Sequence, residues 1–326
     1  MTNWQPGIPD QKWDDQLFKS GGAFTQSSHW AAVQAALGKK TFYAKGAGWQ
    51  CLAILEQGQL GNRIYCPYGP QVSSRSGFDL ALSALKHLSK QEEVSYFRVE
   101  PVGNLTTKQL QVRGLKRAPK DIQPHYTWVK DLTRSTDELL SEMTSTNRNL
   151  YNTAAKKGLK FKQSSSAGDL PIFLDMIHEV AKLTGITPHS DKVFQAIAST
   201  LLQRGAAKIY IATHKNEPVA SALVYDSPTT RYYAHAASYR EARKLHPGSP
   251  LLSTMIFDAK QNGQANFDFF GIAPPNEKNH KWSGFTHFKQ SFGGHMREFL
   301  GTWELPTKPL HYVAYRLAHK AKGLLK

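Results

Sequence analysis

The stretch FDFFGIAPPNEKNHKWSGFTHFKQSFGGHMREFLGTW, residues 267–303, contains the features around which the rest of the chain can be arranged. It begins with an apolar, aromatic run typical of a buried strand and continues through a polar loop with two prolines. It closes on an aromatic, basic and glycine-rich block. Because functional groups are often carried on loops that a rigid strand positions, Lys289, between Phe288 and the Gly293–Gly294 turn, is the first candidate for chemistry. A solvated surface lysine is the alternative, since lysine is among the residues most often exposed.

Length and composition predict two folded domains. The chain has 326 residues, more than a typical single domain, so each half can bury a core of its own. A hydrophobic content of 40% and regular strand and helix patterns argue against disorder. No apolar run approaches the roughly 18 residues that suggest a membrane span, and the first residues lack the basic-then-apolar pattern of a signal peptide. We therefore expect a soluble, cytoplasmic protein.

Cysteine and histidine spacing predicts neither a disulfide framework nor a metal site. The two cysteines, Cys51 and Cys66, lie in apolar, strand-like contexts and are interpreted as buried free thiols. The chain has 13 histidines, but no H-E-x-x-H motif and no Cys-His spacing typical of zinc ligands. No metal or cofactor is predicted.

Positive charge is the strongest compositional feature. The formal net charge is +16, and a surface this basic attracts nucleic acid, an anionic membrane face or phosphorylated small molecules. Residues 106–162 contain 12 Lys or Arg against 5 Asp or Glu, and no acidic residue follows Glu304. Two separate basic zones favour a large or dual anionic partner, with generic solubility as the alternative.

The same order of elements is predicted twice along the chain. In the first half, helical patterns around 14–40 and 77–90 alternate with strand patterns at 42–69 and 95–102. In the second half, helices are predicted at 135–143, 170–185, 191–205 and 250–262, with two hairpins at 208–238 and a strand at 266–272. Helix, strands, helix and strand is the layout of a GNAT-type (acyl-CoA N-acyltransferase) half. No residue-by-residue repeat accompanies it.

Several separated motifs carry a resemblance to a known family. They are SSHW at 27–30, CPYGP at 66–70, FRVEP at 97–101, QPHYTWVKDL at 123–132, the run 148–158, YYAHAAS at 232–238, and FDFFGI followed by GFTHFKQSFGG. With these motifs in this order, the chain resembles the FemABX family of aminoacyl-tRNA-dependent peptidyltransferases, of the FemX-like type without a coiled-coil insertion. The motifs span nearly the whole chain.

The resemblance implies an α/β (α+β) fold with two tandem GNAT-like domains, each a mixed central sheet flanked by helices. The expected domains are 1–133 and 134–305, with 306–326 returning to the first. That final segment also reads as a basic amphipathic helix, with Val313, Leu317 and Leu324 beside basic residues. It could dock on the first domain, lie on an anionic membrane or touch RNA.

The reaction that the resemblance implies moves an amino acid from aminoacyl-tRNA to the stem-peptide amine of a peptidoglycan precursor. The acceptor would be UDP-MurNAc-pentapeptide or lipid II. The family's catalytic Phe-Lys pair matches Phe288 and Lys289, where a lysine ammonium suits a developing oxyanion or the terminal ribose. Glu100 matches a position at which the family can carry an acidic residue, so it is a candidate proton acceptor.

The resemblance also implies residues that bind the two substrates. The positions matched to precursor binding, several of which differ in residue type from the family pattern, are Gln34, Thr187, His189, Tyr233 and His235. The positions expected to contact tRNA are Arg148, Lys156 and Lys157, with a solvated helix face as the alternative. Aminoacyl-tRNA is thus expected as donor substrate with no cofactor, and the protein is expected to be a monomer, with contact to the inner membrane face left open.

Two alternatives remain. A CoA-dependent N-acyltransferase would present helix-start amides to a pyrophosphate, yet the corresponding turn, YREARKLHPGSP, contains only Gly248. A non-catalytic RNA-binding or membrane-binding protein on a GNAT scaffold is the other.

Overall fold

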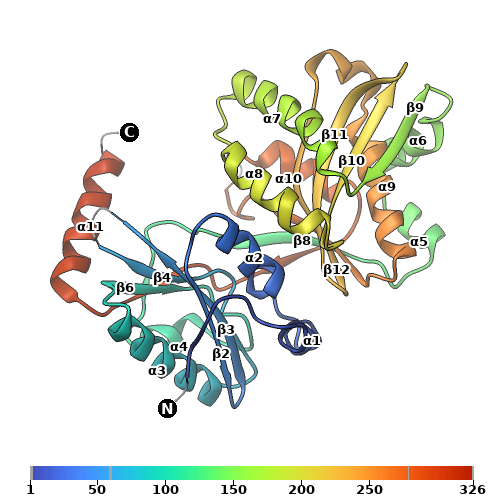
Figure 1. Cartoon of the computed structure of the whole chain (residues 1–326). Helices are drawn as coiled ribbons and strands as arrows, with labels where there is room; N and C mark the ends of the chain where they lie inside the picture. Colours follow the sequence, from blue (N-terminus) through green and yellow to red (C-terminus); the bar gives the residue numbers. More distant parts are fainter. Residues whose placement is uncertain (1–2, 59–60, 278, 325–326) are drawn as a thin grey trace. The chain divides into compact units, whose positions relative to one another are not determined.

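The computed structural model describes residues 3–58, 61–277 and 279–324, without the side chains of 319, 320 and 322–324. The chain divides into two compact units, Met1–His125 with Phe299–Lys326, and Tyr126–Glu298 (Figure 1). The expected domain boundaries were 133/134 and 305/306, and both observed boundaries lie earlier in the sequence. The first lies earlier because the strand Tyr126–Asp131 hydrogen-bonds within the sheet of the second unit. The second lies earlier because the strand Trp303–Pro306 hydrogen-bonds within the sheet of the first unit.

The first unit is built on one mixed sheet. Its strand order is β1-β2-β3-β4-β6-β15-β7, and β5 pairs with β3. The only parallel pair named among these described strands is β4 with β6, in register from Arg63↔Tyr96 to Cys66↔Val99. The strands are β1 (Gln5–Pro6), β2 (Thr41–Gly46), β3 (Trp49–Glu56), β4 (Arg63–Cys66), β5 (Gln71–Val72), β6 (Tyr96–Val99), β7 (Lys116–Arg117) and β15 (Trp303–Pro306).

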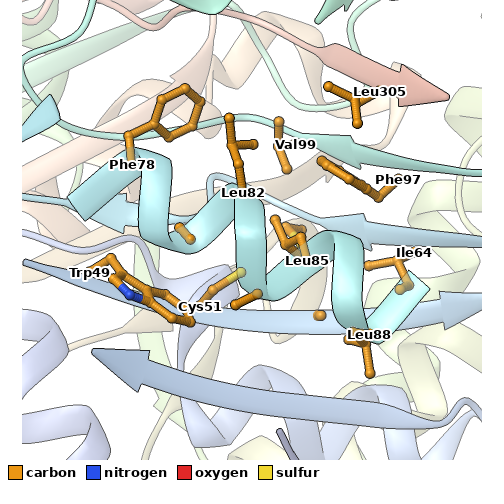
Figure 2. Close-up of a cluster of buried hydrophobic side chains, with 14 of the residues drawn as sticks. Trp49, Cys51, Ile64, Phe78, Leu82, Leu85, Leu88, Phe97, Val99 and Leu305 are labelled. Carbon is orange, nitrogen blue, oxygen red and sulfur yellow. The ribbon is translucent and has the colours of Figure 1, made fainter. Parts of the chain in front are cut away.

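Helix α3 (Arg75–Gln91) covers one face of this sheet. Phe78, Leu82, Leu85 and Leu88 recur at helical spacing, and they pack into the cluster shown in Figure 2 with strand residues such as Cys51. Ser74 caps the helix by accepting a hydrogen bond from the Gly77 N–H. Both cysteines are buried and free, as predicted.

The opposite face of β3 is covered by helices near the N-terminus. Leu52 points away from α3 and packs with Trp13 and Ala31. Asp14, on the same helix as Trp13, accepts hydrogen bonds from the backbone N–H and hydroxyl of Ser28, which joins the two helices. The remaining helical elements of the unit are α1 (Gln11–Lys19), η1 (Phe24–Gln26), α2 (Ser28–Ala36), α4 (Thr107–Gln111) and α11 (Pro309–Leu324).

The C-terminal helix α11 packs on the first unit through aromatic and charged groups. Tyr96 stacks on Tyr315 with ring centroids 4.8 Å apart, and Tyr312 donates a hydrogen bond to Glu304 at 2.9 Å. Glu304 in turn forms a buried ion pair with Arg98 at 2.5 Å. Within the described residues, no helix is both long enough and apolar enough to cross a membrane. Leu324, which is part of the predicted amphipathic pattern, has its side chain outside the described residues, as do the nearby Lys320 and Lys322.

The second unit repeats the plan with a seven-stranded sheet of order β14-β8-β13-β12-β11-β10-β9. Its named parallel pair is β12 with β13, which covers only Thr230↔Asn266 to Tyr232↔Asp268. The strands are β8 (Tyr126–Asp131), β9 (Leu159–Ser164), β10 (Ala207–His214), β11 (Glu217–Asp226), β12 (Thr230–Ser238), β13 (Asn266–Gly271) and β14 (His295–Glu298).

Helices lie on both faces of the second sheet (Figure 1). On one face, α9 and α6 pack on alternate strand residues such as Ala222 and Val224. On the other face lie α7, which contacts β11 and β12, and α8, which is continued by a π-helical turn. The helices are α5 (Thr136–Ser141), α6 (Ser145–Thr153), η2 (Ala167–Asp169), α7 (Leu170–Thr184), α8 (Asp191–Ile197), η3 (Ala198–Leu202), η4 (Arg240–Leu245), α9 (Gly248–Gln261) and α10 (Ser283–Gln290).

The repeated order of elements predicted from sequence is confirmed. In the first unit, antiparallel strands β2, β3 and β4 are followed by α3 and by β6, parallel to β4. In the second, β10, β11 and β12 are followed by α9 and by β13, parallel to β12. On its other side β6 pairs antiparallel with β15, and β13 pairs antiparallel with β8. Neither β15 nor β8 is next in the sequence to the strand with which it pairs.

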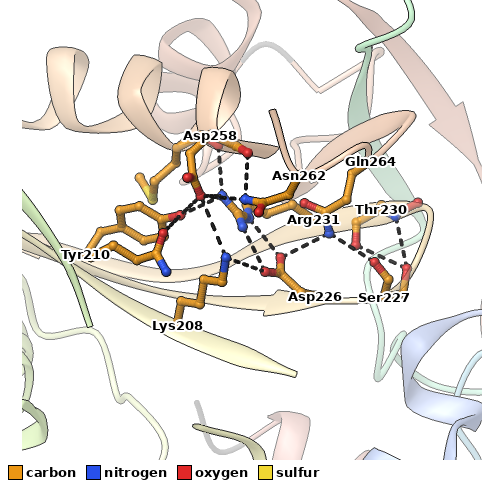
Figure 3. A network of polar contacts seen from close by, with 11 residues as sticks. Lys208, Tyr210, Asp226, Ser227, Thr230, Arg231, Asp258, Asn262 and Gln264 are labelled. Atoms are coloured by element: carbon orange, nitrogen blue, oxygen red, sulfur yellow. Dashed lines mark hydrogen bonds and ion pairs between the residues drawn. The ribbon is translucent and has the colours of Figure 1, made fainter. Parts of the chain in front are cut away.

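A buried ion network fixes α9 to the sheet of the second unit (Figure 3). The Arg231 side chain, fully buried, donates two hydrogen bonds of 2.8 Å to Asp226 and one of 2.6 Å to Asp258 on α9. Tyr210 accepts another from Arg231 at 2.6 Å and itself donates to Asp258. Although burial opposes it, these donors hold the pKa of Asp258 below its usual range. The guanidinium thus joins β11, β12 and α9.

We expect Arg231→Met to lower the free energy of unfolding by about 3–5 kcal/mol, because it leaves Asp226 and Asp258 with only the more distant Lys208, 3.8 Å from each, as a cation. Denaturant unfolding of the purified chain measures this. The matched control is Arg134→Met, since Arg134 is exposed and pairs with Glu142 at the surface, where such pairs contribute about 1 kcal/mol or less. Equal losses in the two variants would contradict this account.

Candidate active site

The end of β13 departs from regular strand geometry. Between Asp268 and Gly271 its pairing with β8 shifts register, and Phe270 adopts a φ of 68°, in the left-handed region that residues with side chains avoid. The buried Asp268 carboxylate accepts a hydrogen bond from the Phe270 N–H at 2.7 Å, which supports the bulge. Strained backbone of this kind clusters at functional sites.

Lys289 reaches this bulge from helix α10. Its ammonium donates a hydrogen bond of 2.5 Å to the carbonyl oxygen of Gly271. The helix is held against the end of β13 by Thr286, whose hydroxyl accepts from the Ala273 N–H at 2.8 Å. Among the described residues this is the one hydrogen bond of the Lys289 side chain, so two of its three N–H protons remain free to bind another group.

The environment shifts the pKa values of Lys289 and Asp268 towards neutrality. Burial lowers the pKa of Lys289 to about 8, and the charge of Asp268 partly opposes this shift. Burial raises the pKa of Asp268 to about 6, opposed by the Phe270 N–H and by the charges of Arg297 and Lys289. At pH 7, Lys289 is therefore mostly a cation in a partly desolvated position, which strengthens its interaction with any developing negative charge.

Phe288, the partner of Lys289 in the matched pair, faces the core. Its ring packs edge-to-face on Phe292 at 5.2 Å, and Phe292 is fully buried against Phe269 of β13. The geometry assigns Phe288 an anchoring contact for α10, which fixes the direction of Lys289. The Gly293–Gly294 turn follows, as predicted, with φ values of 79° and 101°; a Cβ on Gly294 would lie 2.4 Å from the Val129 carbonyl oxygen.

Exposed apolar side chains lie on α10, the helix that carries Lys289, and on β14, the strand that follows it in the sequence. Phe285, four residues before it on the same face of α10, is 51% exposed, and Trp282 at the start of that helix is 37% exposed. Exposed aromatic side chains beside a cation are suited to stacking on a nucleobase. Met296, on β14, is also exposed.

Glu100, the predicted proton acceptor, is a buried hydrogen-bond centre in the first unit. One carboxylate oxygen accepts from the Gln123 N–H at 3.0 Å and the Thr302 hydroxyl at 2.6 Å. The other accepts from the Tyr68 N–H at 3.1 Å and the Tyr65 hydroxyl at 2.9 Å. Burial raises the pKa of this carboxyl and the four donors oppose the rise. Such saturation indicates a structural role in joining four segments of the unit.

Within the second unit, two residues matched to precursor binding, Tyr233 and His235, lie on opposite faces of the sheet. The ring of His235 lies 5.5 Å from that of His189 and 5.0 Å from that of Phe194, on the α7 and α8 face of the sheet. Tyr233 faces the α9 side and lies 6.4 Å from Phe267. The register shift in β12 that leaves Ala234 between them turns the two side chains to opposite faces.

The other two positions of this set differ in accessibility. Thr187 is exposed in the segment between α7 and α8, near His189 in the sequence. Gln34 is 4% exposed on α2 of the first unit. Burial lowers the pKa of His235 to about 3, so this ring is neutral at physiological pH and pairs with the Tyr225 hydroxyl at 3.2 Å.

The three positions expected to contact tRNA also differ. Arg148 donates hydrogen bonds to the carbonyl oxygens of Ser141 and Met143, at 2.9 and 2.5 Å, and so closes the end of α5. Lys156 and Lys157 are exposed on the turn between α6 and β9. Only these two lysines present their charge to solvent in the way that phosphate binding requires.

The start of α9 is poorly suited to hold a pyrophosphate. This helix follows β12, the position that corresponds to a CoA-binding helix in GNAT enzymes. Pro247 and Pro250 have no backbone N–H, and Ser249, Pro250 and Leu251 are buried. A phosphate site at a helix N-terminus needs several exposed N–H groups, which the start of α9 does not offer. This agrees with the sequence of the preceding turn, YREARKLHPGSP, which contains only one glycine.

Comparisons with known proteins identify the family to which the chain belongs. The profile of the FemAB family matches residues 105–214 and 195–320. The lipid II:glycine glycyltransferase of Staphylococcus epidermidis is 20% identical, in an alignment that covers 78% of this chain and 77% of that protein. The chain therefore belongs to the FemAB family, and its enzyme class is aminoacyltransferase.

Solved structures confirm the expected fold class, two GNAT-like domains in tandem. A crystal structure of FemX superposes with a TM-score of 0.83 at 17% identity, over 95% of this chain and 99% of that one. A tandem GNAT protein from the clavulanic acid biosynthesis pathway gives 0.55 at 13% identity, over 94% and 98%.

Asp268 was not among the residues singled out from the sequence. The signal was present, because Asp268 is the only charged residue in the apolar run FDFFGI, and carboxylates are rarely buried without a role. Helix α10 was also missed, since SGFTHFKQ combines glycine, threonine and aromatic residues of modest helix propensity. Docking through Thr286 and Phe288 stabilises it.

We expect Asp268→Asn to lower the pKa of Lys289 below about 8, because the charge that favours the ammonium is removed while the amide oxygen can still accept from the Phe270 N–H. The fraction of Lys289 acetylated by a limiting amine-reactive reagent, followed by mass spectrometry against pH, gives this pKa. The labelling curve should move to lower pH. Asp131→Asn, at the last residue of β8, is the control. Equal curves for Asp268→Asn and wild type would exclude the coupling.

We expect Glu100→Gln to destabilise the first unit by about 1–3 kcal/mol. In either orientation of the amide, its NH₂ group faces a backbone N–H, that of Tyr68 or that of Gln123. Two donors then face each other, and a backbone N–H cannot rotate away. Thermal unfolding measures the loss. Unchanged stability together with loss of transfer would instead assign Glu100 the role of proton acceptor.

Proposed function

We propose that the protein transfers an amino acid from aminoacyl-tRNA to an amine of a peptidoglycan precursor stem peptide. The observation that carries the proposal is the Lys289 ammonium, held at the β13 bulge with two N–H protons free, in a chain of the FemAB family. The curated relative's name supports a lipid II acceptor.

The chemistry requires positioning and charge stabilisation, with no covalent enzyme intermediate. The acceptor amine attacks the carbonyl carbon of the aminoacyl ester, an N–C bond forms, and the carbonyl oxygen becomes negative. Collapse breaks the ester C–O bond, the ribose oxygen leaves as an alcohol, and the proton lost by the amine supplies its hydrogen. Lys289 donates hydrogen bonds to the oxyanion or to the leaving ribose oxygen.

Three features support a tRNA donor. Lys156 and Lys157 are exposed cations on one turn, Phe285 and Trp282 offer stacking surfaces beside Lys289, and the net charge is +16. Arg148 supports this surface indirectly, by closing α5 next to α6.

The acceptor subsite is proposed around His189 and His235, with Thr187 in the adjoining exposed segment. The rings there form an edge-to-face aromatic cluster with Phe194. In this proposal Tyr233, which packs on the α9 side of the sheet, and Gln34, which is buried in the first unit, have structural roles within their own units. Glu100 organises the first unit.

A CoA-dependent N-acyltransferase acting on a peptide or small-molecule amine is the second candidate, favoured by the fold shared with a tandem GNAT protein. The two prolines at the start of α9 weigh against it. The donors can be separated directly: RNase abolishes transfer that uses aminoacyl-tRNA and leaves transfer from acyl-CoA unchanged.

We expect Lys289→Met to lower the rate of transfer about a hundredfold or more, equivalent to roughly 3 kcal/mol of barrier, because one oxyanion donor is lost. The assay supplies total tRNA charged with labelled amino acids and, in separate reactions, UDP-MurNAc-pentapeptide or lipid II. In wild type, activity should fall as pH rises through about 8, where Lys289 loses its charge.

Lys215→Met, on the exposed turn between β10 and β11, is the matched control and should transfer at the wild-type rate. Far-ultraviolet circular dichroism checks that both variants fold. A normal rate in Lys289→Met would remove Lys289 from the reaction centre, and RNase-resistant transfer would favour acyl-CoA. Mass analysis of stem peptides in cells with and without the protein tests the acceptor.

A further inference from the structure

Helix α11 turns a polar and aromatic face to the first unit. Tyr312 is 3% exposed, and both Tyr312 and Tyr315 pack on Tyr96 of β6. Arg316 donates to the carbonyl oxygen of Arg117 at 3.0 Å and lies 3.6 Å from Glu304. At 100° per residue these side chains occupy one side of the helix, so the opposite side faces solvent (Figure 1).

Over residues 310–317, whose side chains the structure describes, the solvent side of α11 carries three large aliphatic residues, the reverse of an ordinary surface helix. Leu310 is 86% exposed, Val313 is 52% exposed and Leu317 is 63% exposed. Their spacing of three and four residues places them in one stripe, which we call the α11 stripe. Three large aliphatic side chains held outward on one helix mark an interaction surface, since isolated exposed residues would not share a face.

Basic residues accompany the α11 stripe. Lys308 and His311 are exposed at the start of the helix. The sequence adds Lys320 and Lys322 farther along, and no acidic residue follows Glu304. Glu304 itself is buried and paired with Arg98, so it does not offset this charge at the surface.

We propose that the α11 stripe is the surface by which the protein lies on an anionic lipid bilayer. Leu310, Val313 and Leu317 would enter the boundary between headgroups and acyl chains, while the adjacent cations attract anionic headgroups. The tyrosine face stays on the first unit, so binding requires no rearrangement of the helix. The charge complementarity favours lipid over a second copy of the chain, whose own stripe would carry the same positive charge.

This proposal extends the proposed function, and it rests on that function for one point, that the acceptor is linked to a lipid. A single short amphipathic segment gives weak, reversible attachment, which suits an enzyme that must meet one substrate at the membrane and another, a tRNA, in solution.

Sedimentation of the full chain with vesicles tests the proposal. The probes are phosphatidylglycerol–phosphatidylcholine vesicles and phosphatidylcholine vesicles, at low and high salt. The test variant is Leu310→Ser/Val313→Ser/Leu317→Ser. The matched control is Ile8→Ser/Leu80→Ser/Val112→Ser, which removes three exposed aliphatic side chains from other elements of the first unit.

We expect wild type and control to bind anionic vesicles, more weakly at high salt and on neutral vesicles, and the test variant to lose about tenfold or more in partition coefficient. Equal binding by test and control variants would overturn the proposal, as would no binding by wild type. If wild type is a dimer that the test substitutions dissociate, the stripe is a dimer interface instead. If wild type binds tRNA but no vesicles, and the test substitutions weaken tRNA binding while the control substitutions do not, the stripe binds tRNA instead.

Transfer to the water-soluble precursor separates this proposal from the proposed function. The test variant should transfer to UDP-MurNAc-pentapeptide at the wild-type rate and to vesicle-borne lipid II more slowly. Vesicle binding without any transfer by wild type would overturn the function alone.

Discussion

Both units depend on one constraint: two neighbouring strands of each sheet run parallel, so the chain must cross a sheet face between them. Helices α3 and α9 make these crossings, and each buries its apolar side over the strands that it joins. In the second unit the parallel pairing of β12 and β13 stops after Tyr232↔Asp268. Beyond that point β12 continues along β11 and β13 continues along β8. The bulge at Phe270 lies where the strands diverge, and the divergence makes the Gly271 carbonyl oxygen accessible to a side chain.

The candidate reaction centre follows from this divergence. Lys289 approaches the freed carbonyl from a short helix that has little stability of its own and is held by Thr286 and Phe288. Burial there lowers the pKa of the ammonium, and Asp268 limits the shift so that the cation persists near neutral pH. Arg231 contributes at a distance by fixing α9 to β11 and β12. Catalysis by charge stabilisation needs this kind of rigid support, because a donor that relaxes during the reaction loses its electrostatic advantage.

Individual elements show why some predictions succeeded. Helix α3, with leucines at helical spacing, and the hairpin of β10 and β11 were predicted because local periodicity and turn chemistry decide them. Helix α10 and strands β14 and β15 were not, because tertiary contacts stabilise them. Glu100 was chosen for its acidity, but only the folded chain shows four donors around it. Tyr233 and His235, two residues apart in a strand, were expected to act together, and the shift at Ala234 turns them to opposite faces.

The sequence by itself determined the FemABX resemblance, the repeated GNAT-like order of elements, the excess of positive charge and Lys289 as the residue to test. These depend on residue type, spacing and composition, which are readable along the chain. The tertiary structure alone decided that Asp268 accompanies Lys289, that α11 turns Leu310, Val313 and Leu317 outward, and that the start of α9 has too few exposed N–H groups for a pyrophosphate. Each of these depends on which groups are buried together and which are left in water, and burial arises only when segments distant in the sequence pack against one another.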